Sequence, residues 1–139
     1  MKIKIKILYT IITMIIIVAC KKENKCVGGS GGQVSVKATF RHHTKDINSM
    51  PAYRDTVYVR YDGLDFPSAG MSGFNSKIIG ESGQSYVMIN GLMCGNYYFY
   101  GTAGDTSWTV GDTVRLAAGL SYTISQSSGE VDVVIPVTE

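Results

Sequence analysis

The chain has 139 residues, enough for one domain of ordinary size. Its 13 Lys and Arg stand against 11 Asp and Glu, a net charge of +2, which is too small an excess to favour nucleic acid as a partner. A hydrophobic fraction of 45% argues against disorder throughout the chain. Three cysteines and two histidines do not supply the paired spacing of a four-ligand zinc site, and we expect no cofactor.

The first residues have the pattern of a secretory signal peptide. Lysines at positions 2, 4 and 6 precede an apolar stretch from Ile7 to Val18. This stretch is shorter than the roughly 20 apolar residues that a transmembrane helix needs. It ends in Ile17-Val18-Ala19-Cys20, which resembles the lipobox of bacterial lipoproteins.

In bacterial lipoproteins the lipobox cysteine accepts a diacylglyceryl group and becomes the mature N-terminus. The resemblance implies that residues 1–19 are removed and that Cys20 carries lipid chains such as palmitate. Burial of these chains holds the protein to a membrane, at about 0.8 kcal/mol for each CH2 group. The alternatives are an ordinary secretory signal with a coincidental cysteine and an uncleaved N-terminal anchor.

The residues after Cys20 point to one group of bacteria. Cys20-Lys21-Lys22 is similar to the start of many mature lipoproteins of the Bacteroidetes type. Surface-export signals in that group are usually acidic, whereas Glu23 is the sole acid among residues 21–25. We therefore expect an outer-membrane lipoprotein of the cell envelope, on either the periplasmic face or the cell surface.

The rest of the chain divides into a tether and one β domain. Residues 20–32 contain the run Gly28-Gly29-Ser30-Gly31-Gly32, which is typical of a flexible linker. Between residues 33 and 139, apolar and polar residues alternate over short segments that turn residues separate. The expected strands are 33–41, 56–61, 85–90, 95–101, 113–116, 120–125 and 130–137, with a further short one at 77–79. No segment has helical periodicity, so we predict an all-β fold, a single antiparallel β-sandwich of about seven strands.

The segment from Gly83 to Tyr97 adds a resemblance at the level of the fold. Its Gly-led turn, alternating apolar residues, Leu92, Gly95 and Tyr97 resemble the strand–turn–strand signature of prealbumin-like sandwiches, including carboxypeptidase regulatory-like domains. The resemblance implies a Greek-key sandwich in which Leu92 and Tyr97 are buried and Gly95 has a positive φ. Other short stretches are similar to small Bacteroidetes-type lipoproteins of unknown function, which imply no activity.

The two histidines form one candidate metal site. His42 and His43 are adjacent, and Asp46 is close enough in sequence to join them as a third ligand. Neighbouring residues on a strand point to opposite faces, so His42 should face inward with Phe40 while His43 faces solvent. A strand end with one packed histidine is therefore the preferred interpretation, and a metal-binding or hydrolytic protein is the alternative.

Two cysteines remain once Cys20 is assigned to lipid. Cys26 and Cys94 could form a disulfide in an oxidising compartment. Cys26 lies in the expected tether, so the bond requires this segment to fold back on the domain. On that ground we prefer two free thiols and keep the disulfide as the alternative.

Two threonines match a short glycosylation sequon. Asp55-Thr56-Val57 and Asp112-Thr113-Val114 have the Asp–Ser/Thr–aliphatic pattern of O-glycosylation in Bacteroidetes-type periplasms. Both threonines begin expected strands, where the hydroxyl can be exposed. O-glycosylation of Thr56 and Thr113 is thus a hypothesis resting on a three-residue motif.

Aromatic residues suggest a contact surface. Tyr97 and Phe99 share one face of their strand, and Tyr98 and Tyr100 share the other. One pair should lie in the core, and Tyr98 and Tyr100 with Trp108 could form an exposed stacking platform for sugars or proteins. The alternative, which we favour, is that the segment 62–83 covers these rings.

The functional prediction follows from these features together. From residue 33 onward there are seven Lys and Arg and ten Asp and Glu, so the domain itself is mildly acidic. This charge argues further against nucleic acid as a partner. No Gly-x-Ser-x-Gly elbow is present, and a small sandwich offers little cleft for paired carboxylates. We predict a lipid-anchored, non-enzymatic binding or structural module of the envelope. Its expected partners are the membrane, through Cys20, and an envelope protein or a glycan. A carbohydrate-binding module is the first alternative.

Overall fold

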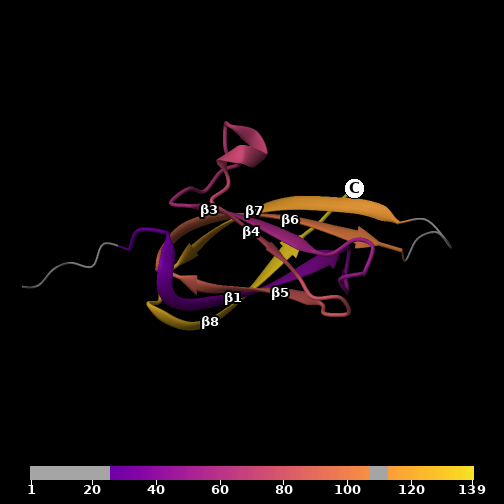
Figure 1. The fold of residues 1–139 in the computed structure, drawn as a ribbon, viewed down its shortest axis with the longest axis horizontal. Coiled ribbons are helices and arrows are strands. Elements are labelled where there is room, and N and C mark those ends of the chain that lie inside the picture. The colour runs from indigo at the N-terminus through magenta and orange to yellow at the C-terminus, as the bar shows by residue number, and fades with distance from the viewer. Residues whose placement is uncertain (1–25, 107–112) are drawn as a thin grey trace, which may run out of the picture.

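The computed structural model describes residues 26–106 and 113–139, and these form two β-sheets packed face to face (Figure 1). In the first sheet, β1 (Ser30–His42) is central, with β5 (Tyr86–Leu92) and the short β2 (Lys45–Asp46) as antiparallel partners and β8 (Ser128–Pro136) as a parallel one. In the second sheet the order is β4 (Ser76–Ile79), β3 (Thr56–Tyr61), β6 (Gly95–Asp105) and β7 (Val114–Ile124), all antiparallel. The predicted all-β sandwich is confirmed.

The core lies between the inner faces of the two sheets. The alternation seen in the sequence produces it, since every second residue of β6 and of β1 from Val34 onward is buried, as are Val57 and Val59 of β3. The largest fully buried side chains are Tyr97, Phe40, Phe99, Leu92, Leu116, Ile124 and Ile135. Burial of Leu92 and Tyr97 is as expected from the turn signature.

One strand pair differs from the expected antiparallel arrangement. β8 runs parallel to β1 over nine paired positions, from Gln33–Ser128 to Arg41–Pro136. A parallel pair needs a long crossover, and here residues 43–127 lie between the two strands. β8 ends at Pro136, which cannot donate to a ladder, as its position in the sequence predicts. The last residues then cross to the second sheet, where Thr138 bridges Ala117.

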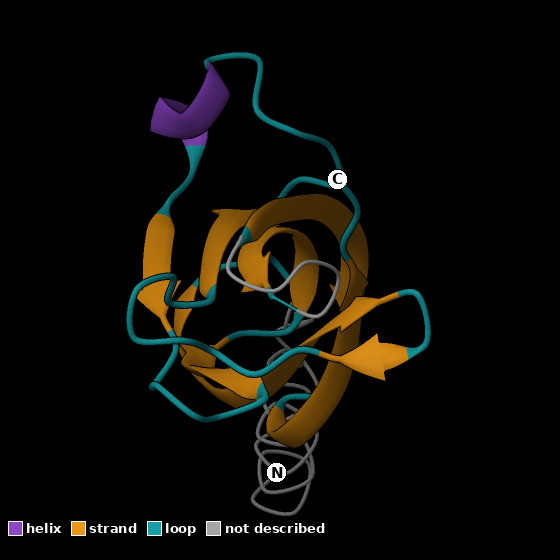
Figure 2. Cartoon of the chain, turned by 90° about the vertical axis from the view of Figure 1, so that its right-hand side faces the viewer, coloured by secondary structure: helices purple, strands orange, loops and turns teal. Residues whose placement is uncertain are grey.

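Two strands differ in extent from those that the sequence predicts. β1 begins at Ser30, so residues 30–32 belong to the sheet and not to a tether. The two strands expected at 113–116 and 120–125 are one continuous strand, β7. The loop between β3 and β4 carries a single 3-10 turn, η1 (Gly70–Gly73), which projects from the sandwich (Figure 2).

Candidate functional site

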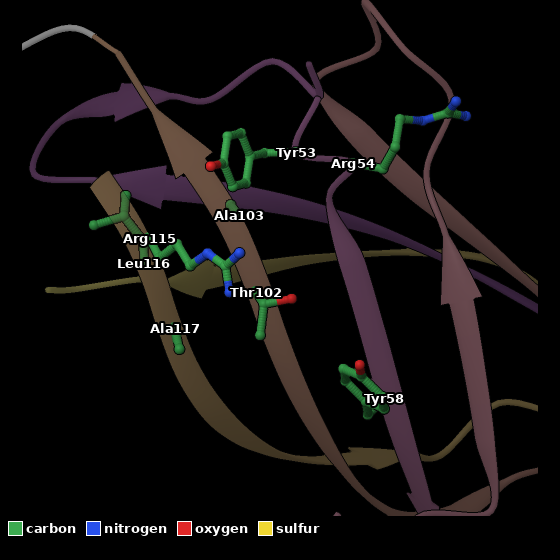
Figure 3. Close-up of a pocket in the computed structure, with 8 residues that line it drawn as sticks. All are labelled: Tyr53, Arg54, Tyr58, Thr102, Ala103, Arg115, Leu116 and Ala117. Atoms are coloured by element: carbon green, nitrogen blue, oxygen red, sulfur yellow. The ribbon is translucent and has the colours of Figure 1, made fainter. Parts of the chain in front are cut away.

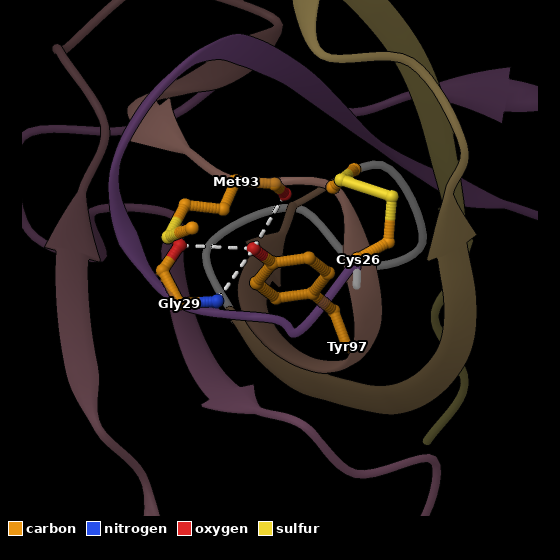
Figure 4. The surroundings of a disulfide bond; sticks show 5 residues. Cys26, Gly29, Met93 and Tyr97 are labelled. Carbon is orange, nitrogen blue, oxygen red and sulfur yellow. Dashed lines mark hydrogen bonds between the residues drawn. A yellow bond between two sulfur atoms is a disulfide. The ribbon is translucent and has the colours of Figure 1, made fainter. Parts of the chain in front are cut away.

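The start of the folded chain is fastened to the turn between β5 and β6. Cys26 forms a disulfide with Cys94, their Cα atoms 4.8 Å apart (Figure 4). This corrects our preference for free thiols, because the glycine-rich segment after Cys26 does fold back on the domain. Gly95 has a φ of 143°, and a Cβ there would lie 2.1 Å from the backbone nitrogen of Gly28. Glycine at positions 28 and 95 thus permits the two backbones to approach closely. From composition alone, the glycine-rich segment is interpreted as a flexible linker.

Tyr97 reinforces this attachment from within the core. Its hydroxyl accepts from the Gly29 N–H at 2.8 Å, and its own proton faces the carbonyl oxygens of Met93 at 2.7 Å and Gly29 at 2.9 Å (Figure 4). Burial raises the pKa of the Tyr97 phenol above its ordinary value of 10.0. The neutral hydroxyl therefore joins the N-terminal segment to the β5–β6 turn.

We expect Tyr97→Phe to lower the free energy of unfolding by about 1–3 kcal/mol, because it removes the hydroxyl that bonds to the Gly29 N–H and to the carbonyls of Gly29 and Met93. Urea denaturation measures the loss, and hydrogen exchange at the Gly29 amide should accelerate. The matched control is Tyr86→Phe, since Tyr86 is contacted by Lys37 through its ring, 4.9 Å from the ammonium. Equal losses in the two variants would contradict the assigned role of the Tyr97 hydroxyl.

His42, His43 and Asp46 do not converge as three ligands of one metal site. His42 is 5% exposed, and its Nδ1 lies 2.9 Å from Oδ2 of Asp105 on β6. The Arg41 Nε donates to Oδ1 of Asp46 at 2.7 Å, so Asp46 belongs to an exposed ion pair. Within residues 26–106 and 113–139, no three His, Cys, Asp or Glu side chains form a group that could hold a metal ion. The metal-site alternative is therefore corrected, and the preferred interpretation, a strand end with one packed histidine, agrees with the burial of His42.

The histidine pair itself has an unexpected geometry. His42 is buried and His43 is exposed, as the strand parity predicts. Their ring centroids are nevertheless only 4.3 Å apart. His43 lies just beyond the end of β1 with a φ of 54°, and this left-handed turn brings its ring back over His42.

The stacking platform predicted from Tyr98 and Tyr100 is covered. Both rings lie on the outer face of the second sheet, where the loop between β3 and β4 places two phenylalanines over them. The centroid of Phe66 is 5.3 Å from that of Tyr100, and Phe74 stacks on Tyr98 at 6.4 Å. Phe66 itself is 42% exposed, so the loop provides the aromatic surface that meets solvent. Trp108, the third predicted member, lies outside the described residues.

Hydrogen bonds hold this covering loop to the sheet. The Arg60 Nη1 donates to the Asp65 carbonyl at 2.8 Å, and the Tyr61 N–H donates to Oδ1 of Asn75 at 2.7 Å. Ser121 on β7 donates to the carbonyl of Leu64. The covering that we favoured from sequence is therefore fixed at both ends of the loop.

The other half of the same outer face is open and forms a pocket of about 370 Å³ (Figure 3). This size lies in the range of small-molecule sites, about 300–1,000 Å³. The lining residues come from β3, β6, β7 and the loop before β3: Tyr53, Arg54, Tyr58, Thr102, Ala103, Arg115, Leu116 and Ala117. Sequence reasoning missed this pocket, although Arg115 occupies an outward position of its strand.

The two glycosylation candidates differ in their surroundings. Thr56 is 7% exposed, and its hydroxyl donates to the Arg54 carbonyl at 3.1 Å. The expectation of an exposed hydroxyl is therefore wrong for Thr56. Thr113 is half-buried and lies just before β7, at the border of the described residues.

Comparisons with known proteins identify no relative. No family model, no curated protein and no solved structure matches the chain. Among the described residues, none of the helical structure has the length and apolarity needed to cross a bilayer. Cys20 and the leader lie outside the described residues. The disulfide, the pocket and the sequence of the leader are therefore the features that bear on function.

Proposed function

We propose that the protein is a lipid-anchored protein of the bacterial cell envelope, held to the outer membrane through Cys20, with its prealbumin-like sandwich acting as a non-enzymatic binding module. The Cys26–Cys94 disulfide carries this proposal. Disulfides form and persist in oxidising compartments outside the cytosol, which agrees with export through the leader in residues 1–19.

The position of the disulfide also fits a membrane anchor. Cys26 follows Cys20 by six residues, which span at most about 20 Å when fully extended. The β5–β6 turn, to which Cys26 is joined, would then face the bilayer at close range. Lysines at positions 21, 22 and 25 lie in this interval, where they favour an anionic surface.

We expect the wild-type protein to incorporate labelled palmitate and to sediment with the membrane fraction, and Cys20→Ala to do neither. The reason is that Cys20 supplies the thiol that accepts lipid. The double variant Cys26→Ser, Cys94→Ser is the control, because it removes the other two thiols and should retain the label. Unchanged labelling and sedimentation of Cys20→Ala would refute lipid anchoring.

A carbohydrate-binding role is the second candidate function. The observation that favours it is the pocket on the outer face of the second sheet, which has two tyrosine rings in its wall and the Thr102 side chain in its lining. Aromatic rings offer a large contact area with a polar rim, which suits saccharides. Tyr53 and Tyr58 take the place of the covered Tyr98 and Tyr100 in this proposal.

A further inference from the structure

The pocket on the outer face of β3, β6 and β7 has a small-residue floor and cationic walls. Thr102 and Ala117 face outward at a paired position of β6 and β7 and leave the sheet surface low there. Tyr53 rises on one side, from the loop before β3, and Tyr58 on the other, from β3 (Figure 3).

Each of the two tyrosine rings has a cation against it. The Cζ of Arg115 lies 5.3 Å from the centre of the Tyr53 ring, and the Nζ of Lys77 lies 5.6 Å from that of Tyr58. Figure 3 shows the Arg115 guanidinium directed toward Tyr53 and Thr102, whereas Arg54 points away from them. Arg54 donates through Nε to the Gly80 carbonyl at 2.7 Å and so belongs to the rim.

Within residues 26–106 and 113–139, no acid forms an ion pair with these cations. The lining contains no Asp or Glu, and within the described residues neither Arg115 nor Lys77 forms an ion pair. The domain from residue 33 onward nevertheless has ten acids against seven bases. Two of those bases, Arg54 and Arg115, line this pocket of an otherwise acidic domain, and a third, Lys77, contacts the ring of Tyr58 in its wall.

We propose that this pocket binds a saccharide that bears a carboxylate, such as a uronic acid unit, with Arg115 holding the carboxylate. The proposal gives the ligand class of the binding role proposed above and does not depend on the lipid on Cys20. A guanidinium is planar and matches a carboxylate with two parallel hydrogen bonds. Stacking on Tyr53 orients that plane, and Thr102 supplies a hydroxyl beside it.

The open form of the pocket favours a sugar ring over a small free anion. A free anion is usually enclosed by several N–H donors, as at helix N-termini and backbone nests. Here one guanidinium converges with the Thr102 hydroxyl and two aromatic walls, which leaves room for a ring with hydroxyl groups. Tyr53 and Tyr58 would contact the faces of that ring.

The test is calorimetric titration of the full protein, extracted in a nonionic detergent, with tetragalacturonate. Maltotetraose is the neutral probe, and an acetylated tetraglutamate peptide is the acidic non-sugar probe. We expect tetragalacturonate to bind with a Kd of about 0.1–1 mM, as befits an open site, and both other probes to bind at least about tenfold more weakly. Binding should weaken as salt rises.

Variants locate the site. Arg115→Met should weaken tetragalacturonate binding by about tenfold or more, and Arg115→Lys by a smaller factor, because lysine keeps the charge but loses the paired geometry. Thr102→Val should weaken it by about threefold. The control Lys45→Met removes an equal charge at the edge of the other sheet and should leave binding unchanged. Thermal denaturation of each variant confirms that the domain is folded.

The proposal is overturned by several results. Absence of binding at about 10 mM tetragalacturonate would do so, as would full binding by folded Arg115→Met. Equal affinity for maltotetraose would refute the carboxylate, and equal affinity for tetraglutamate would refute the saccharide. None of these results would alter palmitate labelling of Cys20, so failure here is distinct from failure of the anchoring proposal.

Discussion

Replacing both Cys26 and Cys94 by serine is expected to lower the free energy of unfolding by about 4 kcal/mol. The two cysteines are separated by 68 positions in the sequence. In the chain-entropy account, a crosslink over a loop of this length removes that amount of freedom from the unfolded state. The loss would be a large share of the stability of a small domain, about 5–15 kcal/mol.

Urea denaturation of oxidised wild type, reduced wild type and the double serine variant measures this effect. Reduced wild type should match the variant, and reductant should leave the variant unchanged. The variant should still fold, because β1 keeps its pairing with β5 and β8 and Tyr97 still bonds to Gly29. A loss below about 1 kcal/mol, or wild-type stability insensitive to reductant, would contradict the role given to the disulfide.

Alternation in the sequence predicted most of the strands because it reflects the face of a sheet that is buried. Val34, Val36, Ala38 and Phe40 all face the core, as their spacing indicates. Alternation does not say which strand lies beside which. The parallel pairing of β1 with β8 therefore stayed invisible, since it joins segments about 100 residues apart.

The candidate site was harder to predict, because its residues meet only through strand register. Arg115 lies opposite Gly104 on β6, and a glycine there leaves space for Tyr53 to approach: a Cβ on Gly104 would lie 2.8 Å from that of Tyr53. The loop containing Phe66 covers one half of the sheet face and leaves this half open. Neither fact can be obtained from local composition.

The glycine-rich segment after Cys26 shows how one composition supports two opposite structures. Glycine makes a linker flexible, and it also permits backbones to approach where any side chain would clash. A Cβ on Gly32 would lie 2.1 Å from the Leu92 carbonyl oxygen, so close packing is the reason for glycine there. Cys26 was the signal in the sequence that this segment is ordered, since a disulfide with Cys94 holds the segment against the domain.

Asp55→Asn is expected to stabilise the protein at pH 8 by about 2–4 kcal/mol. Asp55 lies just before β3, is 0% exposed, and neither carboxylate oxygen has a hydrogen-bond partner in the described residues. Its backbone is fixed, because its N–H donates to Oγ of Ser49 at 2.9 Å and its carbonyl accepts from the Gly80 N–H at 2.7 Å. Burial of the side chain raises its pKa from 3.8 to about 7.

The sign of the pH dependence follows from this shift. Below about pH 4, Asp55 is protonated in both the folded and the unfolded protein, so it has no effect on the pH dependence. Between pH 4 and 7 the folded state binds the extra proton, and stability falls by up to about 1.4 kcal/mol for each pH unit. Above pH 7 both states are ionised and the loss, on the order of 4 kcal/mol, is complete. Asparagine is neutral throughout, so the variant lacks this decline.

Urea denaturation of wild type and Asp55→Asn from pH 4 to 8 gives the difference directly, because contributions from all other groups are common to both proteins and cancel. The two proteins should have similar stability at pH 4 and diverge as pH rises toward 7. The exposed Asp132→Asn on β8 is the matched control and should follow wild type. A constant difference between wild type and Asp55→Asn across this range would show that Asp55 is already ionised in the fold at pH 4.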